Sequence, residues 1–231
     1  MRLLALDTST ECCSAALLLD GVLRLRSTLT DRGHAELLLP MVEELLVEAG
    51  VALADLDGIA FGRGPGAFTG LRLAAGVVQG LALGAGLPVA PVSSLAAVAE
   101  QVRAVPGEPV LVCNDARMGE VYWAVFRRQS DGTMAVVTAE HVSPPDRVAE
   151  PGTGTGCAAG NAFARYPGLR ERLEQAGWTV HDGLYPRADA VARLGAIELA
   201  GGRGVAAEDA LPVYVRDDVA KPGPAAVMGV S

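Results

Sequence analysis

Lysine is nearly absent from this chain of 231 residues. Lys221 is the only one, and it lies in a stretch rich in proline, glycine and alanine near the last residue. A Schiff base and a phosphate-binding P-loop both require a lysine in the folded body of a protein. The sequence therefore excludes a catalytic lysine and a P-loop from that body.

Histidine and cysteine are also few. His34, His141 and His181 are far apart and form no H-x-x-x-H or H-E-x-x-H pair, so we expect no metal site on one helix and no hydrolase triad. The four cysteines show no C-x-x-C spacing, which predicts reduced thiols and a cytoplasmic location. Strand-like residues begin at Leu3, so we expect no signal peptide.

Positive charge is in deficit as well, with a formal net charge of −8 and a pI near 4.9. A protein that holds nucleic acid through its own surface needs clustered cations. If this chain takes part in RNA chemistry, we expect a partner protein to bind the RNA. Half of the residues are hydrophobic, which predicts a globular protein with a substantial core.

Only one long apolar run occurs, from Leu73 to Val92, and it contains no charged residue. Its length would suit a membrane span. However, Gly84, Gly86 and Pro88 divide it into a helix and a short strand. We therefore expect no membrane segment.

Glycine, by contrast, is abundant around this run. Four glycines and a proline between Gly62 and Gly70 predict tight turns that lead into a helix. Within that helix Gly76, Gly80 and Gly84 share one face, so another backbone can approach closely. Two interpretations stay open: the helix is buried in a single core, or its glycine face associates with a partner while the loop serves a nucleotide.

The pattern of elements predicts an α/β fold made of a duplicated unit. An apolar strand, an aspartate, a polar turn, a strand, an Asp-Gly hairpin and a strand occur twice, beginning near residues 3 and 110. We expect strands at residues 3–6, 13–19, 22–29, 58–62, 88–92, 110–114, 121–127, 134–138 and 211–215, and helices at 34–49, about 70–85, 94–104 and 187–200, with broken helical character at 161–175.

This duplication predicts two lobes, each with a mixed sheet and flanking helices. We place the N-terminal lobe at residues 1–105, the C-terminal lobe at 106–216 and a disordered tail at 217–231. The GTGTG run at residues 152–156 is interpreted as a loop, because prolines precede it and no strand–helix context fits a dinucleotide site.

A candidate phosphate site lies in the turn after the first strand. Asp7, Thr8, Ser9 and Thr10 resemble the phosphate hairpin of the actin, sugar-kinase and chaperone ATPase superfamily, in which the aspartate holds hydrated magnesium. Asp115 begins the second such turn. Neither turn has the glycine that lets a backbone close on phosphate, so we interpret the site as vestigial.

Four segments together resemble the bacterial TsaB family, also called YeaZ: LALDTSTECCSAALL, GRGPGAFTGLRLAAG, NDARMGEVYWAVF and ALPVYVR. The likeness is strong over roughly residues 1–130. Its specific signature consists of Gly64, Pro65, Gly66, Phe68, Thr69, Gly70 and Arg72. The resemblance implies a duplicated actin-like fold and a role in making threonylcarbamoyladenosine in tRNA, as partner of the transferase TsaD together with the small ATPase TsaE.

TsaD carries an H-x-x-x-H metal pair where this sequence reads SSLAAV, from Ser93 to Val98. The resemblance therefore implies a non-catalytic scaffold that requires no cofactor itself, with ATP or ADP and Mg²⁺ possible in the complex, and with tRNA contacted only through the complex. An ATPase or small-molecule kinase of the same superfamily stays open as an alternative, as does a glycopeptidase.

The partner surface is predicted on two helices. It would serve a homodimer in isolation and the heterodimer with TsaD in function. Its predicted residues are Leu38, Met41, Val42, Leu45, Leu73, Gly76, Val77 and Gly80.

Overall fold

The computed structural model describes residues 1–149 and 155–216. One sheet contains β1 (Arg2–Asp7), β2 (Cys12–Leu19), β3 (Val22–Leu29), β4 (Gly58–Gly64) and β5 (Val89–Ser93). The other contains β6 (Pro109–Arg117), β7 (Glu120–Arg128), β8 (Met134–Val136), β9 (His141–Ser143), β10 (Cys157–Gly160) and β11 (Thr179–Asp182). The helices are α1 (His34–Ala49), α2 (Phe68–Ala85), α3 (Ser94–Ala99), α4 (Pro167–Gln175) and α5 (Ala188–Ala200).

The two sheets repeat one topology. The first has the order β3-β2-β1-β4-β5 and the second β11-β10-β6-β7-β8, which is the same order read from the other edge. In each sheet a meander of antiparallel strands is followed by two parallel strands. The predicted α/β fold with two mixed sheets is confirmed, and so are the predicted antiparallel strands at both starts.

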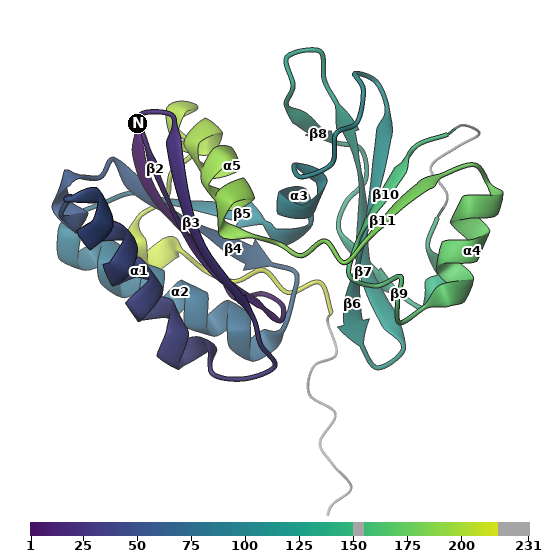
Figure 1. The fold of residues 1–231 in the computed structure, drawn as a ribbon, viewed down its shortest axis with the longest axis horizontal. Coiled ribbons are helices and arrows are strands. Elements are labelled where there is room, and N and C mark those ends of the chain that lie inside the picture. Colours follow the sequence, from purple (N-terminus) through teal and green to yellow (C-terminus); the bar gives the residue numbers. More distant parts are fainter. Residues whose placement is uncertain (150–154, 217–231) are drawn as a thin grey trace, which may run out of the picture.

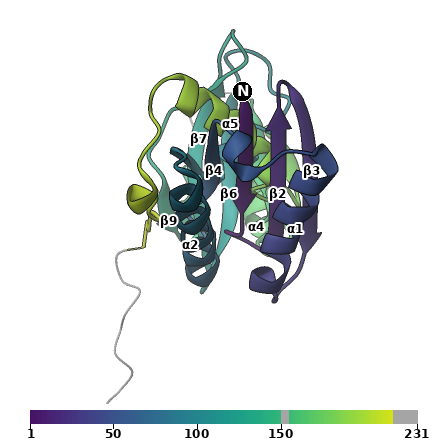
Figure 2. The same cartoon turned by 90° about the vertical axis from the view of Figure 1, so that its left-hand side faces the viewer.

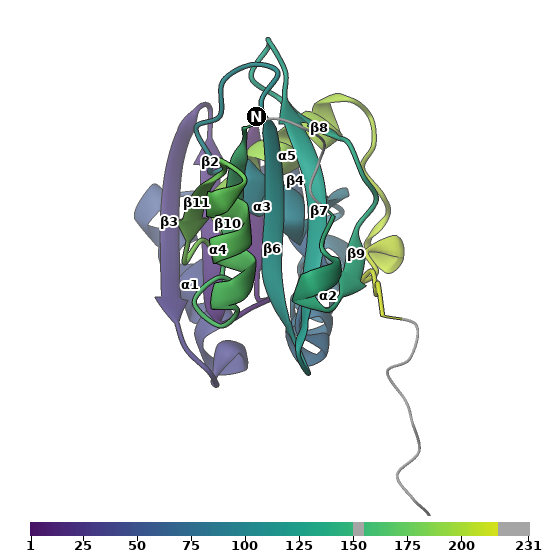
Figure 3. The ribbon, with the colours of Figure 1, turned by 90° about the vertical axis from the view of Figure 1, so that its right-hand side faces the viewer.

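The molecule is layered (Figure 1). Helices α1 and α2 cover the outer face of the first sheet (Figure 2), and α4 covers the outer face of the second (Figure 3). Strand β1 is buried on both faces, since Leu4 and Leu6 pack toward α1 and α2 whereas Leu3 and Ala5 pack toward α5. This double burial is why β1 is a continuous apolar run rather than an alternating one.

Helices α3 and α5 lie between the sheets, and each packs on the sheet of the other half (Figure 1). Leu95 and Val98 of α3 pack on the second sheet, while Val191 of α5 packs on the first. Gly195 allows the close approach of α5, because a Cβ there would lie 2.4 Å from the Cβ of Ala60.

This exchange corrects the expected place of residues 188–216. We assigned them to the C-terminal lobe from their order in the chain, yet α5 packs on β1, β2 and β4, and Val205 pairs with Val89. The physical reason is that the inner face of the first sheet is apolar and α5 supplies its cover. The boundary near residue 105 stays a prediction.

Other sequence-based expectations fare unevenly. A proline inside a helix usually kinks or ends it, yet α1 continues through Pro40, and α3 ends at Ala99 rather than at residue 104. The strand expected at 211–215 is wrong, because residues 211–216 form an irregular segment. Residues 157–160, for which no strand was predicted, form β10. The predicted tail at 217–231 and most of the GTGTG run lie outside the described residues.

The apolar run divides as predicted into α2 and β5. Over the described ranges, α2 is the one helix long and apolar enough to cross a membrane, which by length and composition alone is weak evidence. Its buried residues, such as Ala74 and Val78, pack in the core beneath the first sheet.

Candidate functional site

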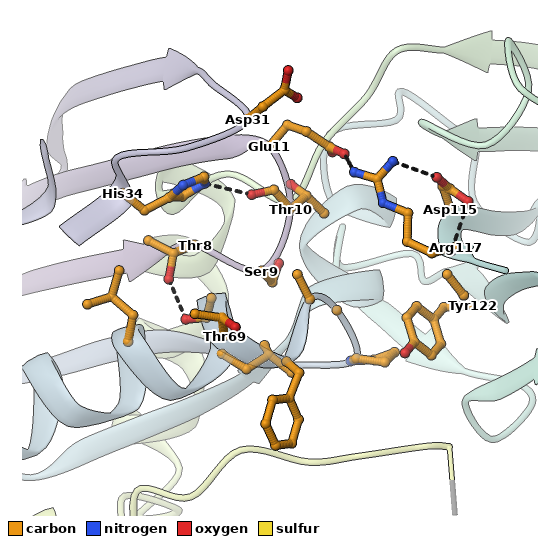
Figure 4. Close-up of a pocket in the computed structure, with 18 of the residues that line it drawn as sticks. Thr8, Ser9, Thr10, Glu11, Asp31, His34, Thr69, Asp115, Arg117 and Tyr122 are labelled. Atoms are coloured by element: carbon orange, nitrogen blue, oxygen red, sulfur yellow. Dashed lines mark hydrogen bonds and ion pairs between the residues drawn. The ribbon is translucent and has the colours of Figure 1, made fainter. Parts of the chain in front are cut away.

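A cleft of about 810 Å³ lies where the two predicted hairpin turns face each other (Figure 4). The β1–β2 turn contributes Thr8 to Glu11, and the β6–β7 turn contributes Asp115 to Arg117. The N-terminal ends of α1 and α2 add His34 and Thr69. Residues 213–216 complete the lining. The structure therefore brings together segments that are far apart in sequence, as the duplication predicted.

Asp7 does not line this cleft. Its side chain is fully buried, and its Oδ1 accepts hydrogen bonds from the backbone N and the Oγ of Ser9, at 2.9 and 2.8 Å. Its Oδ2 has no hydrogen-bond partner among the described residues and lies against Gly62, where a Cβ would be 1.8 Å from it. Burial raises the pKa of Asp7 to about 6, although the hydrogen bonds from Ser9 oppose this rise.

The signature glycines pack directly on the first turn. A Cβ at Gly66 would lie 2.4 Å from the carbonyl oxygen of Ser9, and a Cβ at Gly70 would lie 1.9 Å from that of Thr8. The Oγ1 of Thr8 donates to the carbonyl of Gly70 at 2.7 Å, and the N–H of Ala67 donates to that of Ser9 at 2.8 Å. These glycines serve close contact between the loop and the turn.

In the second turn, Asp115 is held by its own lobe. Its Oδ1 accepts hydrogen bonds from the backbone N of Arg117 and from the hydroxyl of Tyr166, both at 3.0 Å. Its Oδ2 lies 3.3 Å from the guanidinium of Arg117 and 3.7 Å from that of Arg165. Arg117 also pairs with Glu11 across the cleft (Figure 4).

These residues do not fit a magnesium–phosphate site of the superfamily type. Such a site needs a carboxylate open to the ligand, and the Asp7 carboxylate is buried behind the turn. The hydroxyls of Thr8 and Ser9 already donate within the protein. Thr8, Ser9, Thr10 and Asp115 line the cleft as predicted, but the interpretation of Asp7 as a cleft ligand is corrected.

The sequence reasoning missed a cluster at the start of α2. The guanidinium carbon of Arg72 lies 3.8 Å from the centre of the Phe68 ring, and the Arg72 Nε donates to the Tyr214 hydroxyl at 3.0 Å. The rings of Phe68 and Tyr214 are 5.4 Å apart. The signature and the ALPVYVR segment both contain residues of this cluster, but nothing in their order along the chain indicates that they meet.

At the predicted place of the relative's metal pair, the chain carries serines in a hydrogen-bonded network. The Ser93 Oγ accepts from the N–H of Ala96 at 3.1 Å and donates to Glu140. Glu140 is also paired with Arg63, whose two nitrogens lie 3.1 and 3.4 Å from its oxygens. In residues 1–149 and 155–216, no three His, Cys, Asp or Glu side chains are grouped so as to hold a metal ion.

The predicted partner surface is partly corrected. The apolar stripe of α1 packs on its own sheet, so the four α1 residues named for the interface are buried in the core: Leu38, Met41, Val42 and Leu45. On α2, Leu73 and Val77 are half-buried and Gly76 and Gly80 are exposed. Beyond the backbone of α2 itself, no atom of the described residues lies within 4 Å of a Cβ built at Gly76, Gly80 or Gly84, so the glycine face of α2 is open while its other face is buried.

The outward face of these two helices carries apolar residues of its own. Val47 of α1 is 74 % exposed and Leu83 of α2 is 75 % exposed. Leu39, Leu46 and Leu81 line a groove of about 480 Å³ between the helices, together with Val42, Glu43, Val47, Gly50 and Val51. This exposed surface of α1 and α2, with Val47, Leu83 and the three glycines, is called the α1–α2 face below.

Comparison with known proteins finds one matching family and several similar curated sequences. Residues 27–166 match the family described as "TsaD: tRNA N6-adenosine threonylcarbamoyltransferase". The "tRNA threonylcarbamoyladenosine biosynthesis protein TsaB" of Escherichia coli is 40 % identical over 95 % of this chain and 96 % of its own length. That of Haemophilus influenzae is 35 % identical over 95 % of both chains.

Solved structures agree. The protein described as "YeaZ from Pseudomonas aeruginosa" is 46 % identical and superimposes with a TM-score of 0.83, covering 92 % of this chain and 99 % of its own. A second, described as an uncharacterized protein with similarity to peptidase YeaZ from Pseudomonas aeruginosa, is 47 % identical with a TM-score of 0.84, over 93 % and 99 % of the two chains. The fold, the signature loop and near full-length similarity show that the chain belongs to the TsaB (YeaZ) family.

Proposed function

We propose that this protein is a non-catalytic subunit in the synthesis of threonylcarbamoyladenosine in tRNA, and that it acts in the cytoplasm by docking on the transferase TsaD. The curated relatives are named as biosynthesis proteins of this modification. The observation that carries the scaffold role is the α1–α2 face, where exposed glycines and apolar side chains lie open on helices anchored in a rigid core.

The chemistry of this face suits a helical partner. Glycines spaced by four residues let a second helix approach closely. Association would also remove the apolar surface of the exposed Val47 and Leu83 from contact with water, which is favourable. Most of the residues that line the groove are apolar, with Glu43 as the charged exception. We propose that the same face makes a homodimer in isolation and a heterodimer with TsaD, and that TsaE joins the resulting complex.

The cleft supports a non-catalytic role. Asp7 is turned away from it and the turn hydroxyls are occupied, so we assign no nucleotide to this chain alone. Any ATP or ADP with Mg²⁺, and any contact with tRNA, would belong to the complex. An ATPase or kinase would instead turn over ATP alone and lose that activity on Asp7→Ala.

Reconstitution tests the proposal. Purified TsaD, TsaE and this chain are combined with tRNA, ATP, Mg²⁺ and threonylcarbamoyl-adenylate as the group donor, each protein is omitted in turn, and modified nucleoside is measured. A variant with Val47→Glu and Leu83→Glu should lose association by light scattering and lose modification. Val136→Glu, on an exposed valine of β8 in the second sheet, serves as the matched control and should keep both. Full modification without this chain, by this chain alone, or with the double variant would overturn the proposal.

A further inference from the structure

We propose that residues 211–216 act as a strap that fixes the separation of the two halves of the molecule at the mouth of the cleft. The strap is irregular backbone that follows the short 3₁₀ helix Ala207–Asp209. It runs from the side of α2 toward the second sheet (Figure 1). Residues 213–216 form part of the cleft lining.

The first anchor of the strap is on the first half. The N–H of Val213 donates to the carbonyl of Arg63, at the end of β4, at 2.8 Å. Tyr214 contacts Phe68 through its ring and Arg72 through its hydroxyl. A backbone hydrogen bond to Val213, together with an aromatic contact and a side-chain hydrogen bond to Tyr214, thus holds two adjacent strap residues and limits sliding of the strap along α2.

The second anchor is on the β6–β7 hairpin of the other half. Arg216 forms an ion pair with Glu120 and donates to the carbonyl of Ala116 at 3.2 Å. Its other terminal nitrogen lies 3.4 Å from the sulfur of Met118. The Arg216 side chain is only 20 % exposed, so this pair is less screened by water than a surface ion pair.

The spacing of the anchors sets a geometric limit. Val213 and Arg216 are three residues apart, and three residues span at most about 10–11 Å when fully extended. The halves therefore cannot separate at this edge unless an anchor breaks. The hairpin that Arg216 grips is itself fixed in an uncommon shape, since Arg117 and Met118 have φ values of +61° and +54°.

Other contacts also cross between the halves, and among them are two ion pairs that differ from the strap in kind. The Glu11–Arg117 pair involves an arginine that is 61 % exposed, so its contribution is small. Arg63 pairs with Glu140 and also accepts the hydrogen bond of the strap through its carbonyl. The strap thus lies next to the Arg63–Glu140 contact between the halves and adds a second connection there.

Distance measurement between spin labels tests the strap. Labels are placed at Val22→Cys on β3 and Glu171→Cys on α4, two exposed positions outside the cleft and outside the α1–α2 face. The four native cysteines are buried and should resist labelling under native conditions. We expect one narrow distance distribution in the labelled parent. Arg216→Ala and Tyr214→Ala should each shift the main distance to longer values and broaden it.

The control is Leu211→Ala, on a strap residue that is 58 % exposed, which should leave the distribution unchanged. Glu120→Gln removes the same ion pair from the other side with little change of shape, and should reproduce the Arg216→Ala shift without adding to it in the double variant. Circular dichroism confirms that each variant is folded. An unchanged distribution in Arg216→Ala, Glu120→Gln and Tyr214→Ala would overturn the proposal.

Discussion

Gly70 lies against the carbonyl oxygen of Thr8 so closely that a Cβ on Gly70 would be 1.9 Å from it. The same helix carries Gly76, where no described atom beyond the backbone of α2 lies within 4 Å of a built Cβ. Glycines of one helix therefore have two distinct roles. Gly70 permits contact inside the molecule, whereas Gly76 leaves open surface.

This difference predicts opposite effects of one substitution. Gly70→Ala should destabilise the protein by about 3 kcal/mol, because the backbone of the turn must move. Gly76→Ala should be neutral or stabilising by up to about 1 kcal/mol, since alanine favours a helix over glycine. Urea unfolding of both variants measures this. Equal effects would contradict the packing described for the signature loop.

The buried carboxyl of Asp7 predicts a pH dependence. Folding raises its pKa from 3.8 to about 6, so the folded state disfavours the ionised form by about 3 kcal/mol at pH 7. The contribution of Asp7 to the free energy of unfolding is fully present below about pH 4, where the carboxyl is neutral in both states, and it is lost as the pH rises through about 6. Asp7→Asn keeps an acceptor for Ser9 and cannot ionise, so it should flatten this part of the profile.

Urea unfolding at a series of pH values from 4 to 7.5 provides the readout for Asp7. Asp31→Asn, on an exposed residue, is the control and should keep the slope of the parent protein. If Asp7→Asn showed the parent slope, the carboxyl would not be the source of the pH dependence.

Two residues of α1 should separate stability from association. Leu45 is fully buried, so Leu45→Ala should cost about 2–5 kcal/mol of stability. Val47 is 74 % exposed, so Val47→Ala should leave stability within about 0.5 kcal/mol and weaken association. Thermal unfolding and light scattering on the same samples distinguish the two. Weakened association with Leu45→Ala at full stability would restore the original interface prediction.

The thiols should be unreactive in the folded protein. Burial raises the pKa of Cys12 to about 12 and that of Cys13 to about 11, and the negative charge of Asp7 adds to both. Burial also raises the pKa of Cys113, and raises that of Cys157 to about 11. Because the thiolate is the reactive form, Ellman's reagent should detect few thiols in buffer and all four in urea. Rapid native reaction would contradict this burial.

Strong local signals explain what the sequence could predict. Asp20-Gly21 marks its hairpin, and both residues have positive φ, as such a turn requires. In contrast, β10 and β11 have four residues each, too short for a periodic pattern to emerge. Pro40 has no N–H to donate to the carbonyl four residues earlier in the helix. It is tolerated because it is on the exposed side of α1, where water can donate to that carbonyl instead.

The site was harder to predict, since its geometry depends on contacts between distant segments. An apolar stripe on α1 indicates that one face is covered, but not whether its own sheet or another subunit covers it. Likewise, Asp7 follows a strand in the expected place, yet only the position of Gly62 shows that its carboxylate turns inward. Phe68 and Tyr214 are 146 residues apart, and their contact has no local signal.

Because α3 and α5 each pack on the sheet of the other half, the order of synthesis affects how the chain folds. While the ribosome is still adding residues, all five strands of the first sheet exist long before α5, which ends at Ala200. Until then Leu3, Ala60 and Ala90 have no helix over them, because the helix that covers them in the finished molecule is not yet synthesised. The nascent first half therefore exposes an apolar surface that a chaperone can recognise, and its core stays incomplete until α5 has been synthesised.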